Sequence, residues 1–245
     1  STLTHGTPSI LHNYQWYEGL YAQDAWRVSD RVTLNAGVRW EPYFGTVSKN
    51  GAISNFSVEN FNAGIRSTMF VNAPPGLLYP GDPGFPKGKT GLNKQWANIA
   101  PRVGFAWDVT GNGRLAVRSS YGINYDRPTA IFQQVPASGA PFGNRLTLTG
   151  NIPFDNPYRN VPGGQLLPVP VPPPSNIVFP GLGSYAAIDP SINSTRAQSW
   201  NVTVERQLGT SWQVAASYLG TYLDRIWGQD ALNPGVFMGL GPCTL

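Results

Sequence analysis

The sequence has few charged residues, one cysteine and two histidines, and each shortage excludes a class of protein. Charged residues make up 12% of the 245 positions, about half of their share in an ordinary soluble domain. The single Cys243 excludes an internal disulfide framework and a multi-cysteine zinc site. No apolar run approaches the roughly 18 residues of a membrane-spanning helix. The chain is instead rich in turn formers and rings, with 28 glycines, 23 prolines and 12% aromatic residues.

No motif indicates catalysis, so we expect no enzyme activity, no cofactor and no bound metal. His5 and His12 lie near the N-terminus, with no carboxylate placed for a metal site or a Ser-His-Asp site. The segment GLGSYA (181–186) lacks the spacing of a nucleophile elbow. DVTGNG (108–113) lacks the terminal acidic ligand of a calcium loop. The net charge of +4 comes from scattered basic residues, which predicts no nucleic-acid-binding stripe.

Apolar and polar residues alternate with a period of two in RVTLNAGVRWE (31–41), which indicates a strand with one apolar and one polar face. Five further segments share this pattern, and tight turns such as TGNG (110–113) join the six into three hairpins. No helix is expected. The face of the first strand stays unassigned, because Glu18 and Asp24 alternate in step with Trp16 and Trp26. The expected strands are 15–28, 31–43, 97–109, 114–126, 198–208 and 211–223.

Residues 44–96 and 127–197 lose the alternation and are predicted to be long loops. All tight turns would then lie at one end of the strands and all long loops at the other. Loops of this length are uncommon in a compact soluble domain, but transmembrane barrels combine short periplasmic turns with long extracellular loops. We expect ligand recognition on these loops. Their aromatic residues include Phe70, Tyr79, Phe85, Phe132, Phe142, Tyr158 and Phe179.

The aromatic residues of the strands fall at two levels, which predicts two girdles. One level lies close to the tight turns, and the other is on the order of 20–25 Å further along tilted strands, the distance between the two interfaces of an outer membrane. The predicted girdle residues are Trp26, Trp107 and Trp212 near the turns, and Trp40, Tyr125, Trp200 and Tyr222 near the loops. The polar residues expected to face a wet lumen are Arg39, Glu41, Arg102, Arg118, Asn124 and Asp126.

These patterns predict an all-β fold, namely an antiparallel up-and-down transmembrane β-barrel segment. We expect residues 1–245 to form part of one barrel domain in a bacterial outer membrane, with lipid as the partner of the apolar face. The chain opens STLTHGTPSI, without an initiator methionine or the basic and apolar segments of a secretory signal. It is therefore expected to be an interior piece of a longer protein or a trimmed chain.

Three segments resemble hairpins of TonB-dependent outer-membrane receptors, and in particular the Oar-like branch with an N-terminal carboxypeptidase-regulatory-like domain. They are YAQDAWRVSDRVTLNAGVRWEPY (21–43), NIAPRVGFAWDVTGNGRLAVRSSYGINYDRP (98–128) and QSWNVTVERQLGTSWQVAASYLGTYLDR (198–225). The resemblance covers all six strands in the same order. It implies a barrel of about 22 strands, an N-terminal plug inside the barrel and a TonB box near the start of the protein.

The sequence contains no segment that resembles the plug, the N-terminal domain or the TonB box, so the chain corresponds to the middle of such a barrel. The function implied is energised uptake of a bulky solute across the outer membrane, with TonB engaged only through the absent N-terminal segment. An alternative is a structural or adhesive β protein. Its strands would pair between chains through open edges and produce oligomers or filaments, because six strands cannot close a barrel of this size.

Overall fold

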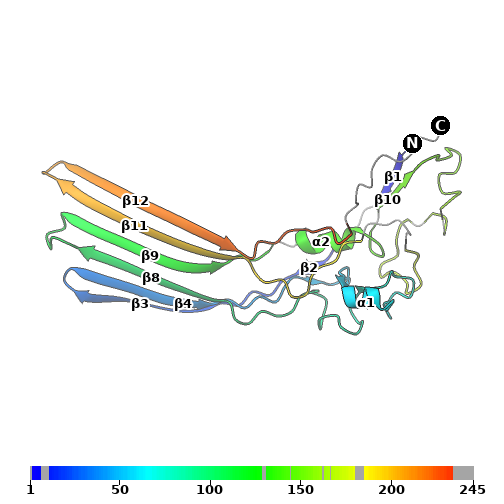
Figure 1. Cartoon of the computed structure of the whole chain (residues 1–245), viewed down its shortest axis with the longest axis horizontal. Helices are drawn as coiled ribbons and strands as arrows, with labels where there is room; N and C mark the ends of the chain where they lie inside the picture. The colour runs from blue at the N-terminus through cyan, green and yellow to red at the C-terminus, as the bar shows by residue number, and fades with distance from the viewer. Residues whose placement is uncertain are drawn as a thin grey trace.

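The structure is a computed structural model, and it describes residues 2–6, 11–128, 131–143, 145–161, 163–165, 167–179 and 185–233. The molecule is elongated (Figure 1). A twisted sheet forms one half, and the segments that connect and flank its strands fold together in the other half. Two levels of organisation therefore need an explanation: an extended sheet, and a separate body built from the long connections.

The sheet has six strands in the order β3-β4-β8-β9-β11-β12, and every neighbouring pair is antiparallel. The expected all-β antiparallel fold is therefore confirmed. Each strand lies within one of the expected segments, apart from differences of a few residues at the ends. The strands are β3 (Leu20–Ser29), β4 (Val32–Trp40), β8 (Ile99–Asp108), β9 (Leu115–Tyr125), β11 (Arg196–Leu208) and β12 (Trp212–Asp224).

The three tight turns lie together at one end of the sheet, and the long connections leave from the other end (Figure 1). In the turn between β8 and β9, the two carboxylate oxygens of Asp108 accept hydrogen bonds from the backbone N–H groups of Gly111 and Gly113, each at 2.8 Å. Both glycines have positive φ, at 75° and 74°, which other residues rarely adopt. The sequence TGNG thus reverses the chain in the way that its composition predicts.

Strand register separates the residues of the sheet into two continuous faces. Paired residues point to the same side, so an unbroken register extends one face across all six strands. The single irregularity among the pairs between β3 and β4 falls between Arg27 and Ser29, at the turn end. One face, named here the aromatic face, includes the row Trp26, Leu34, Phe105, Ser119, Val202 and Tyr218. The opposite, polar face includes the row Gln23, Gly37, Arg102, Gly122, Ser199 and Thr221.

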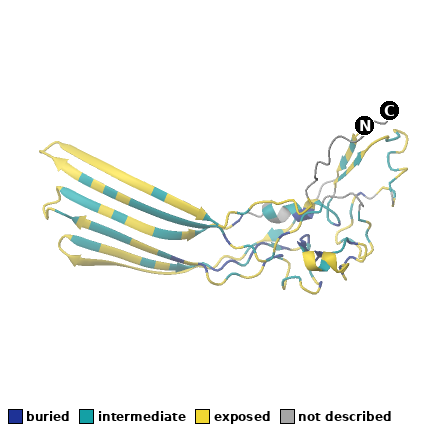
Figure 2. Ribbon diagram, in the orientation of Figure 1, coloured by how far each residue is buried: buried dark blue, intermediate teal, exposed yellow. Residues whose placement is uncertain are grey.

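Neither face of the sheet is covered by other parts of the described chain (Figure 2). Strand β3 is exposed along its whole length, and Ala100 is the only buried residue in the six strands. Trp26 and Trp212 keep 62% and 75% of their surface exposed. An apolar face of this size without a cover excludes the arrangement of a soluble sandwich, in which the apolar face would be the core.

The loop body consists of the described residues of 41–98 and 126–195, with the flanking segments 2–6, 11–19 and 225–233. Short two-stranded ladders hold it together. Strand β2 (Asn13–Tyr14) pairs with β5 (Val47–Ser48), and β6 (Asn55–Phe56) pairs with β7 (Leu77–Leu78). At the far end β1 (Thr2–Gly6) pairs with β10 (Arg145–Thr149). The long connections are therefore folded rather than irregular throughout.

The expectation that the chain has no helix is wrong. Two short helices lie in the connections, α1 (Val58–Asn62) and α2 (Ile131–Ser138). Helix α1 begins at Ser57, whose side chain accepts a hydrogen bond from the backbone N–H of Asn60 at 3.2 Å, as an N-cap residue does. A helix of five residues is too short to produce a hydrophobic period. In the described part of the chain, no helix is long and apolar enough to cross a membrane.

Two small hydrophobic cores lie in the loop body. The first contains Tyr43, Ile53, Leu92 and Ile188, with Phe85 packed against it. In the second, Phe70 and Tyr79 meet edge to face at 4.8 Å between ring centroids, and both are at most 9% exposed. Phe142 and Phe179 pack against this second cluster. Phe70 and Tyr79 therefore form a core of the loop body, and the expectation that the long loops recognise a ligand stays a prediction.

The buried carboxylate of Asp82 joins two loop segments beside the second core by hydrogen bonds. Asp82 accepts hydrogen bonds from the hydroxyls of Ser67 at 2.6 Å and Thr68 at 2.8 Å, and from the backbone N–H groups of Thr68, Met69 and Tyr79 at 2.7, 3.1 and 2.9 Å. Burial alone would raise the pKa of this carboxyl, but the hydrogen bonds outweigh burial and lower the pKa below the ordinary value of 3.8. Asp82 is thus stabilised as the anion.

We predict that Asp82→Asn loosens the loop body, because an amide NH₂ would face the donors Ser67 and Tyr79. The loss is expected to be on the order of 3 kcal/mol, seen as faster limited proteolysis within residues 44–96. Asp189→Asn, at an exposed turn, serves as the control. Because the folded pKa is the lower one, this stabilisation is present above pH 3.8 and is lost as pH falls through the folded value. Equal proteolysis of the two variants would contradict the prediction.

Position 220 on the aromatic face has no room for a side chain, because the Trp200 indole lies against Gly220. It pairs with Trp200 across β11 and β12, and a Cβ at Gly220 would lie 2.3 Å from Cε2 of the indole. We predict that Gly220→Ala displaces Trp200 and lowers the free energy of unfolding by about 1–3 kcal/mol, measured by denaturant titration in detergent. Gly104→Ala is the matched control, since its Cβ would lie at an ordinary 3.5 Å from Asn35. A similar loss in both variants would refute the role of this contact.

Candidate functional site

The polar face brings together four of the six residues that the sequence predicts to face a lumen. Arg39, Arg102, Arg118 and Asn124 all fall on this face, because their partners across the ladders are Ala100, Gly37, Thr203 and Ala197 respectively. Glu41 and Asp126 lie beyond the ends of β4 and β9, so their positions follow from the segments that leave the sheet.

Hydrogen bonds and ion pairs connect charged side chains across neighbouring strands. The guanidinium of Arg102 donates to Oδ1 of Asn124 at 3.0 Å. Arg118 forms an ion pair with Glu205 of β11 at 3.2 Å. Glu205 is not among the predicted site residues, although its alternation with Val204 already indicates the polar face. Near the tight turns the same face surrounds a concavity of about 720 Å³, whose charged lining residues include Asp30, Arg31, Asp108, Arg114, Arg118 and Glu205.

A second charged group lies where the sheet meets the loop body. Oε1 of Glu41 accepts hydrogen bonds from Nε of Arg39 and from the Tyr17 hydroxyl, both at 2.6 Å, and Arg39 also donates to the Tyr17 hydroxyl. Burial would raise the pKa of Glu41, but these two donors outweigh it and lower the pKa. The guanidinium carbon of Arg127 lies 3.7 Å from the centroid of the Tyr17 ring, a cation–π contact. Tyr17 therefore links Arg39, Glu41 and Arg127.

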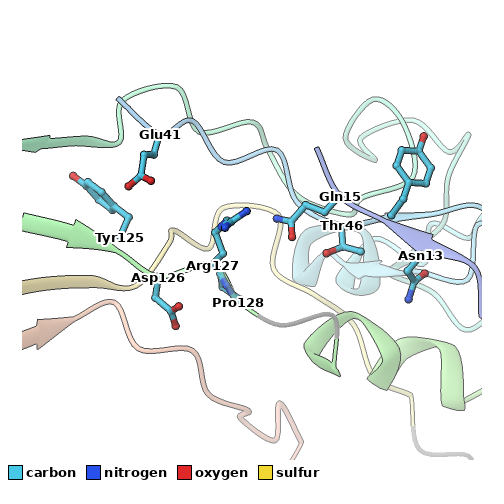
Figure 3. Close-up of a pocket in the computed structure, with 9 residues that line it drawn as sticks. Asn13, Gln15, Glu41, Thr46, Tyr125, Asp126, Arg127 and Pro128 are labelled. Carbon is cyan, nitrogen blue, oxygen red and sulfur yellow. The ribbon is translucent and has the colours of Figure 1, made fainter. Parts of the chain in front are cut away.

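A polar cavity of about 580 Å³, named here the junction pocket, opens beside this group (Figure 3). Three segments form it: the region around β2, the chain after β4 and the chain after β9. Its lining residues are Asn13, Tyr14, Gln15, Glu41, Thr46, Tyr125, Asp126, Arg127 and Pro128. A volume of this size is in the usual range for small-molecule sites. The sequence indicates Glu41 and Asp126, but it has no signal that identifies Gln15 and Arg127.

All seven residues predicted to form girdles lie at strand positions that belong to the aromatic face. Trp40, Trp107 and Trp200 are paired with Ile99, Val117 and Tyr121, so they share this face with the row that contains Trp26. Trp40 also donates from Nε1 to the carbonyl of Trp96 at 2.6 Å and stacks on that ring. The predicted girdle residues on this face are Trp26, Trp40, Trp107, Tyr125, Trp200, Trp212 and Tyr222.

The register also assigns the face of β3, which alternation alone leaves open. Asp24 pairs with Ala36 and therefore lies on the aromatic face, between the positions of Ala22 and Trp26. Its Oδ1 accepts a hydrogen bond from the backbone N–H of Ala25 at 2.8 Å. β3 is one of the two outermost strands of the described sheet.

The described residues contain no group of three or more His, Cys, Asp or Glu side chains that could hold a metal ion. Cys243 lies outside the described residues. His5 is hydrogen-bonded to the Tyr158 hydroxyl at the far end of the loop body. The polar face and the junction pocket offer hydrogen-bond donors, hydrogen-bond acceptors and charged groups to a ligand.

Comparison with known families agrees with this arrangement. The family model described as outer membrane beta barrel domain matches residues 2–243. No curated protein and no solved structure matches the chain. Because the match extends over nearly the whole chain, the protein belongs to this outer-membrane β-barrel family. Its location is the outer membrane, and its environment there is lipid.

Proposed function

We propose that this outer-membrane β-barrel protein acts in a TonB-dependent receptor of the Oar-like type, which takes up a bulky solute with energy from the inner membrane. The observation that supports the proposal most directly is the division of one antiparallel sheet into an exposed aromatic face and a polar face with paired charges. In a barrel of this kind the aromatic face contacts lipid, and the polar face lines a wet interior.

The open edges of the sheet support a larger barrel. Within the described chain, β3 and β12 are the outermost strands, and each has one edge without a partner strand. Unpaired backbone N–H and C=O groups are costly in a bilayer, so a membrane sheet has to close. We infer that further strands adjoin β3 and β12 and complete the barrel. A sheet that pairs with other copies through these edges is the alternative, a structural or adhesive assembly.

The proposed partner of the polar face is a plug domain of the same protein. Arg118, Glu205 and Arg102 form hydrogen bonds across the strands and still keep exposed surface. Such a face suits a polar protein segment and water inside the lumen. The loop body would form the outer mouth, where solute arrives. TonB would act on the plug through a segment that lies outside this sequence.

We predict that Leu34→Arg impairs membrane insertion of the natural full-length protein, because Leu34 lies on the aromatic face, paired with the girdle residue Trp26. An arginine on the lipid face costs about 2–4 kcal/mol at the bilayer midplane and less toward an interface, so a loss of about 1 kcal/mol or more is expected. The measurement is the equilibrium between the inserted and unfolded protein in liposomes. Asn35→Arg, one position along on the polar face, is the matched control and should insert normally. If Leu34→Arg inserts as well as Asn35→Arg, the lipid assignment is wrong.

The plugged lumen is tested by conductance in planar bilayers. We predict that the full-length protein passes no steady current, because a plug fills its lumen. Mild denaturant that leaves the barrel folded should open it reversibly. A steady current without denaturant would overturn the proposal in favour of a passive pore. No current under either condition would indicate a filled interior without a gate, as in a structural barrel.

The energised part of the proposal is tested by crosslinking in cells. We expect the full-length protein to crosslink to the TonB-type protein of the same organism, in competition with a known receptor that serves as the positive control. Failure to crosslink while the control does so would contradict TonB dependence. Recovery of crosslinks between β3 and β12 of different copies would instead favour the adhesive assembly.

A further inference from the structure

Two nitrogen donors face one another in the junction pocket. Gln15 and Arg127 both line this cavity, and in the view of Figure 3 the amide end of Gln15 and the guanidinium of Arg127 point toward each other. Nε2 of Gln15 is buried and has no hydrogen-bond partner. A buried donor without an acceptor is costly, on the order of 1–3 kcal/mol. The arrangement therefore lacks an acceptor between the two side chains.

Arg127 forms no direct ion pair with a carboxylate in the described part of the chain. Its guanidinium carbon lies 3.7 Å from the centroid of the Tyr17 ring, in a cation–π contact. The Glu41 carboxylate interacts electrostatically with Arg127, but its Oε1 already accepts hydrogen bonds from Arg39 and Tyr17. Asp126 points away from Arg127 (Figure 3).

We propose that the junction pocket binds an anionic group of the solute, a carboxylate or a phosphate, between the guanidinium of Arg127 and the amide of Gln15. A planar guanidinium matches both kinds of oxyanion and can donate two hydrogen bonds to them. The amide N–H of Gln15 supplies a third donor, and Tyr17 keeps the guanidinium oriented. Naming the anion as part of a transported solute rests on the proposed function; the anion site itself does not.

The composition of the rest of the pocket sets the remaining requirements for the ligand. Asn13, Tyr14 and Tyr125 add an amide and two phenol groups, so the ligand also presents polar or ring surfaces beyond its anionic group. A volume of about 580 Å³ accommodates a small molecule or one end of a larger one. We infer that the pocket holds the charged end of the solute while the loop body contacts the rest.

The test is chemical modification of arginine with phenylglyoxal on the full-length protein in detergent, followed by mass spectrometry of the peptides. Acetate and inorganic phosphate are the two probes, added separately. We predict that one or both slow the modification of Arg127 severalfold, because the bound anion covers its guanidinium. The probe with the larger effect identifies the oxyanion. Arg145, exposed on β10, is the internal control and should react at the same rate throughout.

Variants of Gln15 separate binding from folding. Gln15→Glu puts a carboxylate beside Arg127 and should abolish shielding by either probe, and Gln15→Met, which removes the donor at similar size, should reduce it. Gln23→Glu places the same charge on the polar face of β3, outside the pocket, and should behave as the parent protein. Arg145 reactivity and heat-modified gel mobility establish that each variant is folded.

Two results would overturn the anion site. The first is that neither probe slows the modification of Arg127 in the parent protein. The second is that the probes slow it in Gln15→Glu as much as they do in the parent protein. The first result is expected if the Gln15 side chain turns so that its oxygen accepts directly from Arg127. Absence of shielding in the parent protein together with a gated conductance would reject the anion site and keep the transporter. Shielding without gating would keep the anion site and reject the transporter.

Discussion

The structure depends on one unbroken ladder of backbone hydrogen bonds, from β3 to β12. In lipid a strand has no water to pair its N–H and C=O groups, so each strand needs a neighbour along its whole length. The register also determines the face on which every side chain of a strand lies, because a shift by one residue would exchange the two faces. The placement of Arg102 opposite Gly37 and Gly122 and that of Trp26 opposite Leu34 are consequences of the same ladder.

Close packing on the two faces limits the size of the residue at particular positions. Trp200 occupies the space that a side chain at position 220 would need, so a large ring on β11 is accommodated by a glycine on β12. On the polar face Gly37 approaches Gln23 closely in a similar way, with a Cβ position 3.1 Å from Cβ of Gln23. Large and small residues on neighbouring strands are therefore matched in pairs, and the pairing depends on the register.

The loop body follows a different principle from the sheet. It folds as a small soluble protein does, with two buried aromatic and aliphatic clusters and a carboxylate, Asp82, that ties residues 67–69 to the turn at 79–82. Because it has its own core, it holds Gln15, Glu41 and Arg127 in defined positions at the end of the sheet. The junction pocket depends on both parts, since the sheet provides the ends of β4 and β9 and the loop body provides the opposite wall.

The sequence by itself determined the strands, their hairpins and the two faces of every strand but the first, because alternation with a period of two is a local property of each strand. It also indicated Arg39, Arg102, Arg118 and Asn124 on the polar face. Only the tertiary structure decided the face of Asp24, the burial of Phe70 and Tyr79, the two short helices and the pocket between Gln15 and Arg127. These features arise from contacts between segments far apart in the chain, and such contacts leave no periodic signal in the sequence.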